Sequence, residues 1–380
     1  MTTTEPTTWQ GAADRLVDDL RAKGAVRTEQ VAAAIRAVPR HLFITGHYTG
    51  PDGRFTAVDP GESAEEFLAL AYSDRGIMTH VPQDPARTHS STSQPSIVAK
   101  MLEAADVSPG MRVLEIGAGT GWNSALIAAI TGTEVLTVEH SEVVADEART
   151  ALSRAAVTNV RVHTGDGYHG LPGYRFDRII VTCGIAGIAP AWFDQLTDTG
   201  FILAPLAHGG MHPITRIPLP GSGDEPTGQL VTIADFMTAA GPLYGDLRTS
   251  PATRSVTFPT PSGPLDAPFP TDLTRDTFAD LCTYLAGHEP WVTCASTADG
   301  TYGGCAVVNA DETAAVFIQP NGIHPSDDTP STLDLAKATA KHVASWEHRG
   351  RPALQSWTCR LHPAGLADQP IWAPGSWTCG

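Results

Sequence analysis

Apolar residues near the start of the chain recur at helical spacing. Those within residues 16–20 share one face of a predicted helix, which Gly24 ends. Thr28 can cap a second helix, whose apolar positions recur over 31–38. Beyond these helices the pattern predicts, in order, a loop over 44–66, a loop over 80–93 and a helix over 96–105.

From residue 112 onward, short apolar strands alternate with stretches of helical periodicity. Strands separated by helices of this length form parallel sheets with right-handed crossovers, so the segment predicts an α/β fold. The elements predicted in order are a strand over 112–116, a helix to 130, a strand over 135–139, a helix over 142–155, strands over 159–164 and 177–182, a helix over 190–196 and a strand over 201–206. Two more strands, over 213–220 and 228–236, are predicted as a hairpin at the sheet edge, because a glycine-rich turn separates them.

The chain is longer than one hydrophobic core usually organises, and its pattern changes again after residue 245. The expected division is an N-terminal helical and loop segment over 1–90, an α/β domain over 91–245, a proline-rich linker over 246–272 and an additional α+β domain over 273–380 that recognises the substrate. Four tryptophans of the last domain could line a peptide groove or fill a small core, and these are Trp346, Trp357, Trp372 and Trp377.

Composition and charge narrow the class of partner. With 42% hydrophobic and 17% charged residues the chain is globular, and no apolar run approaches the roughly 20 residues that span a bilayer. A formal charge of −16 repels phosphate, so neither nucleic acid nor a membrane is expected as partner. The six cysteines have no metal-ligand spacing, which predicts reduced thiols and no metal site. The start of the chain has no export signal, so we expect a cytoplasmic protein.

The motif that carries chemistry is Glu115-Ile-Gly-Ala-Gly-Thr-Gly121, which follows a strand and opens a helix. Gly117, Gly119 and Gly121 let the backbone turn tightly and approach a bound ligand. Their G-x-G-x-G spacing differs from the G-x-G-x-x-G that holds the pyrophosphate of a dinucleotide. S-adenosylmethionine (SAM) has no phosphate, so the tighter turn favours SAM as the cofactor.

Acidic residues at the ends of the next two strands support a nucleotide site. Glu139 closes the second strand, where its carboxylate can accept hydrogen bonds from both ribose hydroxyls. Asp166 follows the third strand, where it can bind the adenine amino group. The adjoining residues His140 and Gly167 are assigned to the same site. Because neighbouring parallel strands end at one edge of a sheet, we expect these residues to surround one SAM molecule.

Several segments together resemble the protein-L-isoaspartate O-methyltransferase family. They span roughly residues 10–240 and occur in the family's order, at 38–45, 71–75, 92–95, 113–121, 165–167 and 177–182. The resemblance implies a Rossmann-like SAM-dependent methyltransferase sheet with N-terminal helices. Arg40 and His41, in the first segment, are expected to fix those helices on the sheet.

The resemblance also assigns roles to single residues. It implies that the Thr-Ser-Gln-Pro segment lies over the methyl donor and that Ser93 helps to hold the substrate carboxyl group. It implies a catalytic role for Glu115. Thr92, His89 and Cys183 are expected on the substrate side of the site.

Two departures from the usual repair enzyme affect the expected substrate. The run Cys183-Gly-Ile-Ala186 replaces an alanine-rich segment, and the chain continues for about 140 residues beyond the catalytic domain. Both features are similar to a branch of the family that accompanies the maturation of ribosomal peptides such as graspetides and lanthipeptides. The resemblance then implies methylation of an Asp side chain in a macrocyclic peptide, with the ester closing to a succinimide and opening to isoaspartate. The alternative is repair of isoaspartyl residues in damaged proteins.

The chemistry makes few demands on the protein. A carboxylate with a pKa of about 4 is already ionised at neutral pH, so no strong general base is needed. Catalysis then depends on placing the carboxylate oxygen in line with the sulfonium methyl group. Two other classes stay open, a binding module with a vestigial nucleotide domain and a nicotinamide-dependent dehydrogenase. The intact acidic residues disfavour the former and the glycine spacing disfavours the latter.

Overall fold

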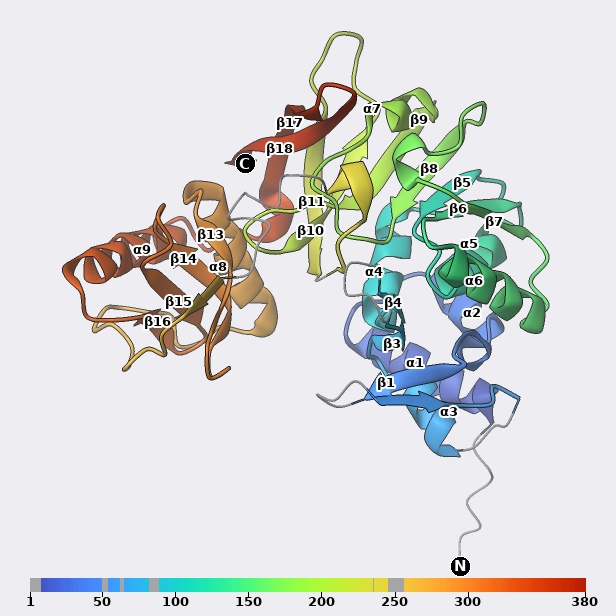
Figure 1. Cartoon of the computed structure of the whole chain (residues 1–380), viewed down its shortest axis with the longest axis horizontal. Coiled ribbons are helices and arrows are strands. Elements are labelled where there is room, and N and C mark those ends of the chain that lie inside the picture. Colours follow the sequence, from blue (N-terminus) through green and yellow to red (C-terminus); the bar gives the residue numbers. More distant parts are fainter. Residues whose placement is uncertain (1–7, 50–53, 62–64, 82–88, 235, 245–255) are drawn as a thin grey trace, which may run out of the picture. The chain divides into compact units, whose positions relative to one another are not determined.

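The structure, a computed structural model, describes residues 8–49, 54–61, 65–81, 89–234, 236–244 and 256–380 (Figure 1). The chain forms two compact units. The first contains the residues up to Cys183 and Ala191–Leu203, and the second contains Gly184–Pro190 and Ala204–Gly380. In the described ranges, no helix combines the length and the apolar character needed to cross a membrane.

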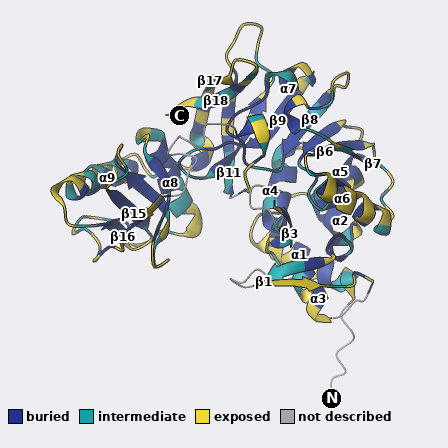
Figure 2. Ribbon diagram, in the orientation of Figure 1, coloured by how far each residue is buried: buried dark blue, intermediate teal, exposed yellow. Residues whose placement is uncertain are grey.

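A parallel sheet with the strand order β9-β8-β5-β6-β7 forms the centre of the first unit. Its strands are β5 (Val113–Ile116), β6 (Val135–Glu139), β7 (Val160–Thr164), β8 (Phe176–Val181) and β9 (Leu196–Pro205). β5, β6 and β8 are buried along almost their whole length, as expected for a parallel sheet covered on both faces (Figure 2). The predicted α/β fold class is confirmed, and β6 has the bounds expected from the sequence.

Helices precede β5 and follow β5, β6, β7 and β8, and the four α-helices lie close to their predicted positions. They are α4 (Pro95–Ala105), α5 (Trp122–Thr131), α6 (Glu142–Arg154), the short 3-10 helix η2 (Gly167–His169) and α7 (Pro190–Asp194). Ser141 caps α6 by accepting a hydrogen bond from the N–H of Val144 at 3.4 Å. Gly132 ends α5 with a φ of 66°, a left-handed conformation that glycine adopts without strain.

Residues before the sheet form helices and two small hairpins. They are α1 (Trp9–Ala22), α2 (Glu29–Ala37), the 3-10 helix η1 (Arg40–Phe43), β1 (Gly46–Thr49), β2 (Arg54–Ala57), α3 (Glu65–Ala71), β3 (Ile77–His80) and β4 (Ser90–Thr92). Thr28 caps α2 as predicted. The loops predicted over 44–66 and 80–93 were partly wrong, because β1 pairs with β2 and β3 pairs with β4. Parts of both loops, at 50–53, 62–64 and 82–88, lie outside the described residues.

An antiparallel group of strands belongs to the second unit. It contains β10 (His212–Pro218), β11 (Thr227–Ala234), β17 (Trp357–Leu366) and β18 (Gln369–Cys379). The predicted hairpin is confirmed, since β10 pairs with β11. It does not lie at the sheet edge, because β11 also pairs with β17, which in turn pairs with β18.

A second sheet in this unit has the strand order β12-β13-β14-β15-β16. Its elements are β12 (Val256–Phe258), β13 (Val292–Thr297), β14 (Gly303–Val308), β15 (Ala315–Gln319) and β16 (Gly322–Pro325), accompanied by α8 (Arg275–His288) and α9 (Pro330–His348). The segment predicted as a linker therefore contributes β12, although residues 246–255 lie outside the described ranges. Trp346 and Trp357 fill the core of this unit, whereas Trp372 and Trp377 are half-buried. The four domain ranges drawn from the sequence stay a prediction.

Candidate active site

The loop between β5 and α5 has the conformation that its glycines were expected to provide. Gly117, Gly119 and Gly121 have φ values of 99°, 52° and 84°, which favour glycine. A Cβ atom added to Gly117 would lie 2.6 Å from Oγ1 of Thr182, and one added to Gly119 would lie 3.4 Å from the carbonyl oxygen of Ser91. The loop is therefore closely approached by the end of β8 and by β4.

The ends of three neighbouring strands meet at this loop. The N–H of Gly117 donates to the carbonyl oxygen of Val138 at 2.8 Å, and the N–H of Gly165 donates to that of Glu139 at 2.9 Å. These two bonds join the end of β6 to the residues that follow β5 and β7. The structure thus brings the glycine loop, Glu139 and Asp166 to one edge of the sheet, as the sequence predicted.

Glu139 is 7% exposed and its carboxylate contacts the loop. Oε2 accepts a hydrogen bond from the N–H of Gly119 at 3.1 Å, and Oε1 accepts one from the N–H of Ser141 at 3.1 Å. Each carboxylate oxygen has a second lone pair, so the group retains acceptor capacity for ribose hydroxyls. His140, also assigned to this site, is exposed just beyond β6.

Asp166 and Gly167 form the turn after β7. Oδ1 of Asp166 accepts a hydrogen bond from the N–H of Tyr168 at 2.9 Å, which caps η2. A Cβ atom added to Gly167 would lie 2.6 Å from Cγ2 of Ile116. Trp192 is fully buried and its indole N–H donates to the carbonyl oxygen of Gly167 at 2.9 Å. Nothing local in the sequence indicated that Trp192 supports this turn.

Glu115 lies wholly inside the protein. Its oxygens accept hydrogen bonds from Nδ2 of Asn123 (2.7 Å), Oγ of Ser124 and Oγ1 of Thr137 (2.8 Å). Burial raises the pKa of Glu115 to about 7, and the nearby Glu139 carboxylate adds to the rise, although the three donors oppose it. Because its contacts join β5, α5 and β6, Glu115 positions the glycine loop. Its predicted catalytic role stays a prediction.

The Thr-Ser-Gln-Pro segment runs from β4 into α4. Thr92 is 2% exposed, and its hydroxyl has no hydrogen-bond partner among the described residues. Ser93 follows, and its carbonyl oxygen accepts a hydrogen bond from Nη2 of Arg40 at 3.0 Å. His89 is exposed just before β4. The strand β4, which ends at Thr92, lies beside Gly119 through Ser91. The expected place of the Thr-Ser-Gln-Pro segment over the methyl donor stays a prediction.

Cys183 follows the end of β8, next to Thr182. Oγ1 of Thr182 donates to the carbonyl oxygen of Gly117 at 2.5 Å, and Sγ of Cys183 lies 3.9 Å from the position that a Cβ atom on Gly117 would take. Burial, with the Glu139 and Glu115 charges, raises the pKa of Cys183 to about 12. The residue therefore presents a neutral thiol beside the loop.

The residues at this edge fit SAM. The positive φ values of the three glycines give the loop a tight turn, which lets a ligand approach the backbone without meeting side chains of the loop. Glu139 has spare acceptor sites for the ribose. The carboxylates of Glu139 and Asp166 suit a ligand that carries a cationic sulfonium. The hydroxyl of Thr92 and the indole N–H of Trp122, which begins α5, are buried without a partner among the described residues. Both could pair with the polar amino-acid half of the cofactor.

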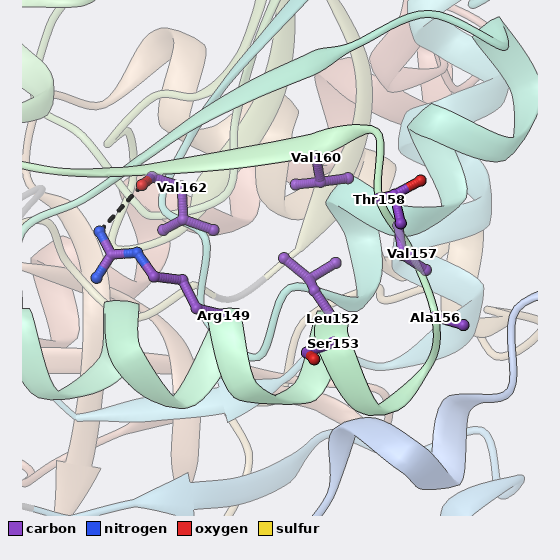
Figure 3. Close-up of a pocket in the computed structure, with 8 residues that line it drawn as sticks. All are labelled: Arg149, Leu152, Ser153, Ala156, Val157, Thr158, Val160 and Val162. Atoms are coloured by element: carbon purple, nitrogen blue, oxygen red, sulfur yellow. Dashed lines mark hydrogen bonds between the residues drawn. The ribbon is translucent and has the colours of Figure 1, made fainter.

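A separate hollow of about 300 Å³ lies where α6 and the turn after it meet β7 (Figure 3). It is lined by Arg149, Leu152, Ser153, Ala156, Val157, Thr158, Val160 and Val162. Arg149 donates to the carbonyl oxygen of Val162 at 3.0 Å across it. It includes no residue predicted for the site. A search of the described residues for three or more grouped metal-binding side chains finds none.

Comparisons with known proteins agree on one family. Residues 54–223 match the family model described as Protein-L-isoaspartate(D-aspartate) O-methyltransferase. A protein-L-isoaspartate O-methyltransferase from Gloeobacter violaceus is 37% identical over 193 residues, which cover 50% of this chain and 80% of that protein. One from Pyrococcus horikoshii is 35% identical over 193 residues, which cover 50% of this chain and 76% of that protein.

A solved structure of a protein-L-isoaspartate O-methyltransferase extends the likeness to nearly the whole chain. It has a TM-score of 0.54 and 22% sequence identity, and covers 97% of this chain and 99% of its own. At this identity the likeness concerns the fold alone. It extends to the part of the chain beyond the methyltransferase sheet.

Proposed function

Because the chain belongs to the protein-L-isoaspartate O-methyltransferase family, whose members are SAM-dependent carboxyl O-methyltransferases, we propose that it methylates a carboxylate in a peptide or protein. The observation that carries this proposal is the meeting of the glycine loop, Glu139 and Asp166 at one sheet edge, with the segment of Ser93 alongside. SAM supplies a methyl group bonded to a cationic sulfur.

Some residues of the site bind the cofactor, and others bind the acceptor carboxylate. The glycine loop and Glu139 hold the donor by the backbone and the ribose, and Asp166 receives the adenine amino group. Ser93 orients the acceptor carboxylate, and Thr92 and Cys183 shield it from water. Since the acceptor is already ionised, its alignment with the methyl group accounts for most of the catalysis. His89, which is exposed just before β4, is proposed to contact the substrate.

An isoaspartyl residue is the better supported acceptor. The relatives that the chain resembles are named for it. The length of the chain does not argue against it, because the solved structure of that name is similar over 97% of this chain. The macrocyclic acceptor expected from the sequence stays a prediction.

A second candidate is an Asp side chain in a macrocyclised ribosomal peptide. The observation that favours it is Cys183 beside the glycine loop, the first residue of a Cys183-Gly-Ile-Ala186 run where the usual repair enzyme has alanines. The backbone nitrogen of the next residue would then attack the methyl ester, lose its proton and expel methanol, which closes a succinimide. Addition of water opens the succinimide to isoaspartate. The segment 273–380 is proposed to contribute to peptide recognition in either case, through its partly exposed tryptophans Trp372 and Trp377.

One assay separates the two acceptors. The purified chain is incubated with SAM and three peptides of the same sequence: linear isoaspartyl, linear aspartyl and cyclised aspartyl. Mass spectrometry follows the gain of a methyl group. Methylation of the isoaspartyl peptide supports the first candidate, and methylation of only the cyclised peptide supports the second. Methylation of none, although S-adenosylhomocysteine binds by calorimetry, would contradict the proposed function.

We further propose a cytoplasmic location. None of the six cysteines, all within the described ranges, forms a disulfide bond. Cysteines that are not in disulfides are typical of a reducing compartment. Fractionation of producing cells with an antibody against the chain tests this.

A further inference from the structure

Arg40 is a fully buried cation at the start of η1. Its Nη1 donates to the carbonyl oxygens of Ala71 (2.6 Å) and Ser73 (3.0 Å). Its Nη2 donates to those of Arg75 (3.0 Å) and Ser93 (3.0 Å). One guanidinium therefore joins two segments, and the second contains the residue proposed to orient the acceptor.

The same guanidinium also faces the donor side of the site. It lies over the ring of Trp122, 5.0 Å from the ring centroid. Trp122 begins α5 directly after Gly121, the last glycine of the loop. Arg40 thus contacts both the residue that opens the helix behind the donor loop and the backbone of the acceptor segment.

A further contact fixes the segment that Arg40 holds. Oδ1 of Asp74 accepts a hydrogen bond from the N–H of Ser96 at 2.8 Å, in the first turn of α4, and Lys23 donates to Oδ2 at 2.9 Å. Residues 71–75 are therefore bonded both to the Arg40 side chain and to the helix that follows Ser93.

This arrangement depends on the shape of the guanidinium. None of the four hydrogen-bond partners of Arg40 is a carboxylate, so carbonyl dipoles stabilise the buried charge. Burial lowers the pKa of Arg40 to about 9, and the Tyr72 and Asp74 charges oppose this. A planar fork can bond several carbonyls at fixed angles, whereas an ammonium is a point donor with three hydrogens.

We propose that Arg40 is a positioning residue for methyl transfer, which holds the Ser93 backbone against the start of α5 so that the acceptor carboxylate meets the methyl group of the donor. The inference rests on the proposed function. It gives Arg40 a role in acceptor alignment, in addition to the role in fixing the N-terminal helices that the sequence predicts.

The test compares Arg40→Lys with Arg178→Lys. Arg178 is a matched control, because it is also buried, donates to the carbonyl oxygens of Ala105 (2.5 Å) and Asp177 (2.7 Å), and stacks on Phe201 at 4.0 Å. It lies near the start of β8, away from the glycine loop. Arg40→Lys should raise KM for the peptide about tenfold and change the Kd of S-adenosylhomocysteine by less than about threefold. Arg178→Lys should lower only the melting temperature.

A double-mutant cycle tests whether the effect passes through Ser93. In a Ser93→Ala background, Arg40→Lys should raise KM by less than about twofold further. If Arg40→Lys does not fold, Trp122→Leu, which removes the ring beneath the guanidinium, should raise the peptide KM in the same direction.

Three outcomes would overturn the proposal. They are an unchanged peptide KM in folded Arg40→Lys, an equal change in Arg178→Lys, and full additivity with Ser93→Ala. A wild-type chain that methylates no peptide would instead overturn the proposed function, and this inference with it.

Discussion

The carboxylate of Glu139 accepts a hydrogen bond from the backbone N–H of Gly119 at 3.1 Å. This bond joins the end of β6 to the middle of the glycine loop. The same carboxylate accepts the N–H of Ser141, the residue that caps α6. One side chain therefore fixes the loop and presents the acceptor proposed for the ribose, so the shape of the loop and its affinity for the cofactor should change together.

Replacing Glu139 should weaken cofactor binding. Glu139→Ala removes the ribose acceptor and the restraint on the loop, and hydrogen bonds to a charged group contribute about 1.5–3 kcal/mol each. In Glu139→Ala we expect the Kd of S-adenosylhomocysteine, measured by calorimetry, to rise by about 10- to 100-fold. The Kd of Glu139→Gln should lie between those of the wild type and Glu139→Ala. Glu142→Ala is the control, because Glu142 is exposed in the first turn of α6. Equal affinities in Glu139→Ala and the wild type would contradict the ribose assignment.

Glu115 should make the stability of the fold depend on pH. Its pKa is raised from 4.5 to about 7 by burial, so the folded protein binds this proton more tightly than the unfolded chain. The stabilisation is complete below about pH 4.5 and is lost as the pH rises through about 7. Glu115→Gln cannot ionise. The free energy of unfolding of the wild type, relative to Glu115→Gln, should therefore fall by about 3 kcal/mol between about pH 4 and pH 8.

Chemical denaturation at several pH values measures this difference. Asp106→Asn serves as the control, because Asp106 is an exposed carboxylate at the end of α4. Parallel pH profiles for the wild type and Glu115→Gln would mean that the Glu115 carboxylate is not protonated in the folded state near neutral pH.

The part of the site predicted from the sequence is the part that local rules determine. A strand, a G-x-G-x-G turn and a helix follow one another within a few residues, and the next two strand ends must meet them in a parallel sheet. The place of Glu139 and Asp166 at this sheet edge could therefore be predicted from their positions alone, whereas their roles toward SAM stay a prediction. The contacts of Arg40 could not be predicted in this way, because they join residues 31 to 53 positions apart through backbone carbonyls, which any residue type provides.

The second unit was harder to predict for a related reason. β11 pairs with β17, more than one hundred residues later, and β12 arises within a proline-rich stretch. Pairing at this separation depends on tertiary packing, and periodicity within a short window does not encode it. The short β1–β2 and β3–β4 hairpins were missed because glycine, proline and aspartate around them indicated loops.

Cys183 should react slowly with alkylating reagents. A thiol with a pKa of about 12 is almost wholly protonated at about pH 8, and the thiolate is the reactive form. In iodoacetamide labelling followed by peptide mass mapping, Cys183 should be modified more slowly than a free cysteine in a short peptide. Rapid modification of Cys183 would contradict a neutral thiol at this position. Cys183→Ala should retain S-adenosylhomocysteine binding within about threefold, since no charge is removed from the site.

Gly187 should be needed for the stability of the second unit. A Cβ atom at Gly187 would lie 2.7 Å from the carbonyl oxygen of Trp372 and 2.9 Å from Cδ1 of Ile371. The next residue, Ile188, exchanges two backbone hydrogen bonds with Trp372, at 2.9 and 2.8 Å, so the backbone cannot move away without breaking them. Gly187→Ala should therefore cost about 1–3 kcal/mol, the usual range for overpacking.

The matched control is Gly263→Ala, in the same unit, because a Cβ atom there would have no heavy atom within 4 Å. It should leave the free energy of unfolding within about 1 kcal/mol of the wild type or raise it slightly, since alanine reduces the freedom of the unfolded chain. Calorimetric melting of the three proteins compares them under one condition. If Gly187→Ala and Gly263→Ala melt at the same temperature, the segment at Ile188 is not held by Trp372, because a held segment has no space for the added methyl group.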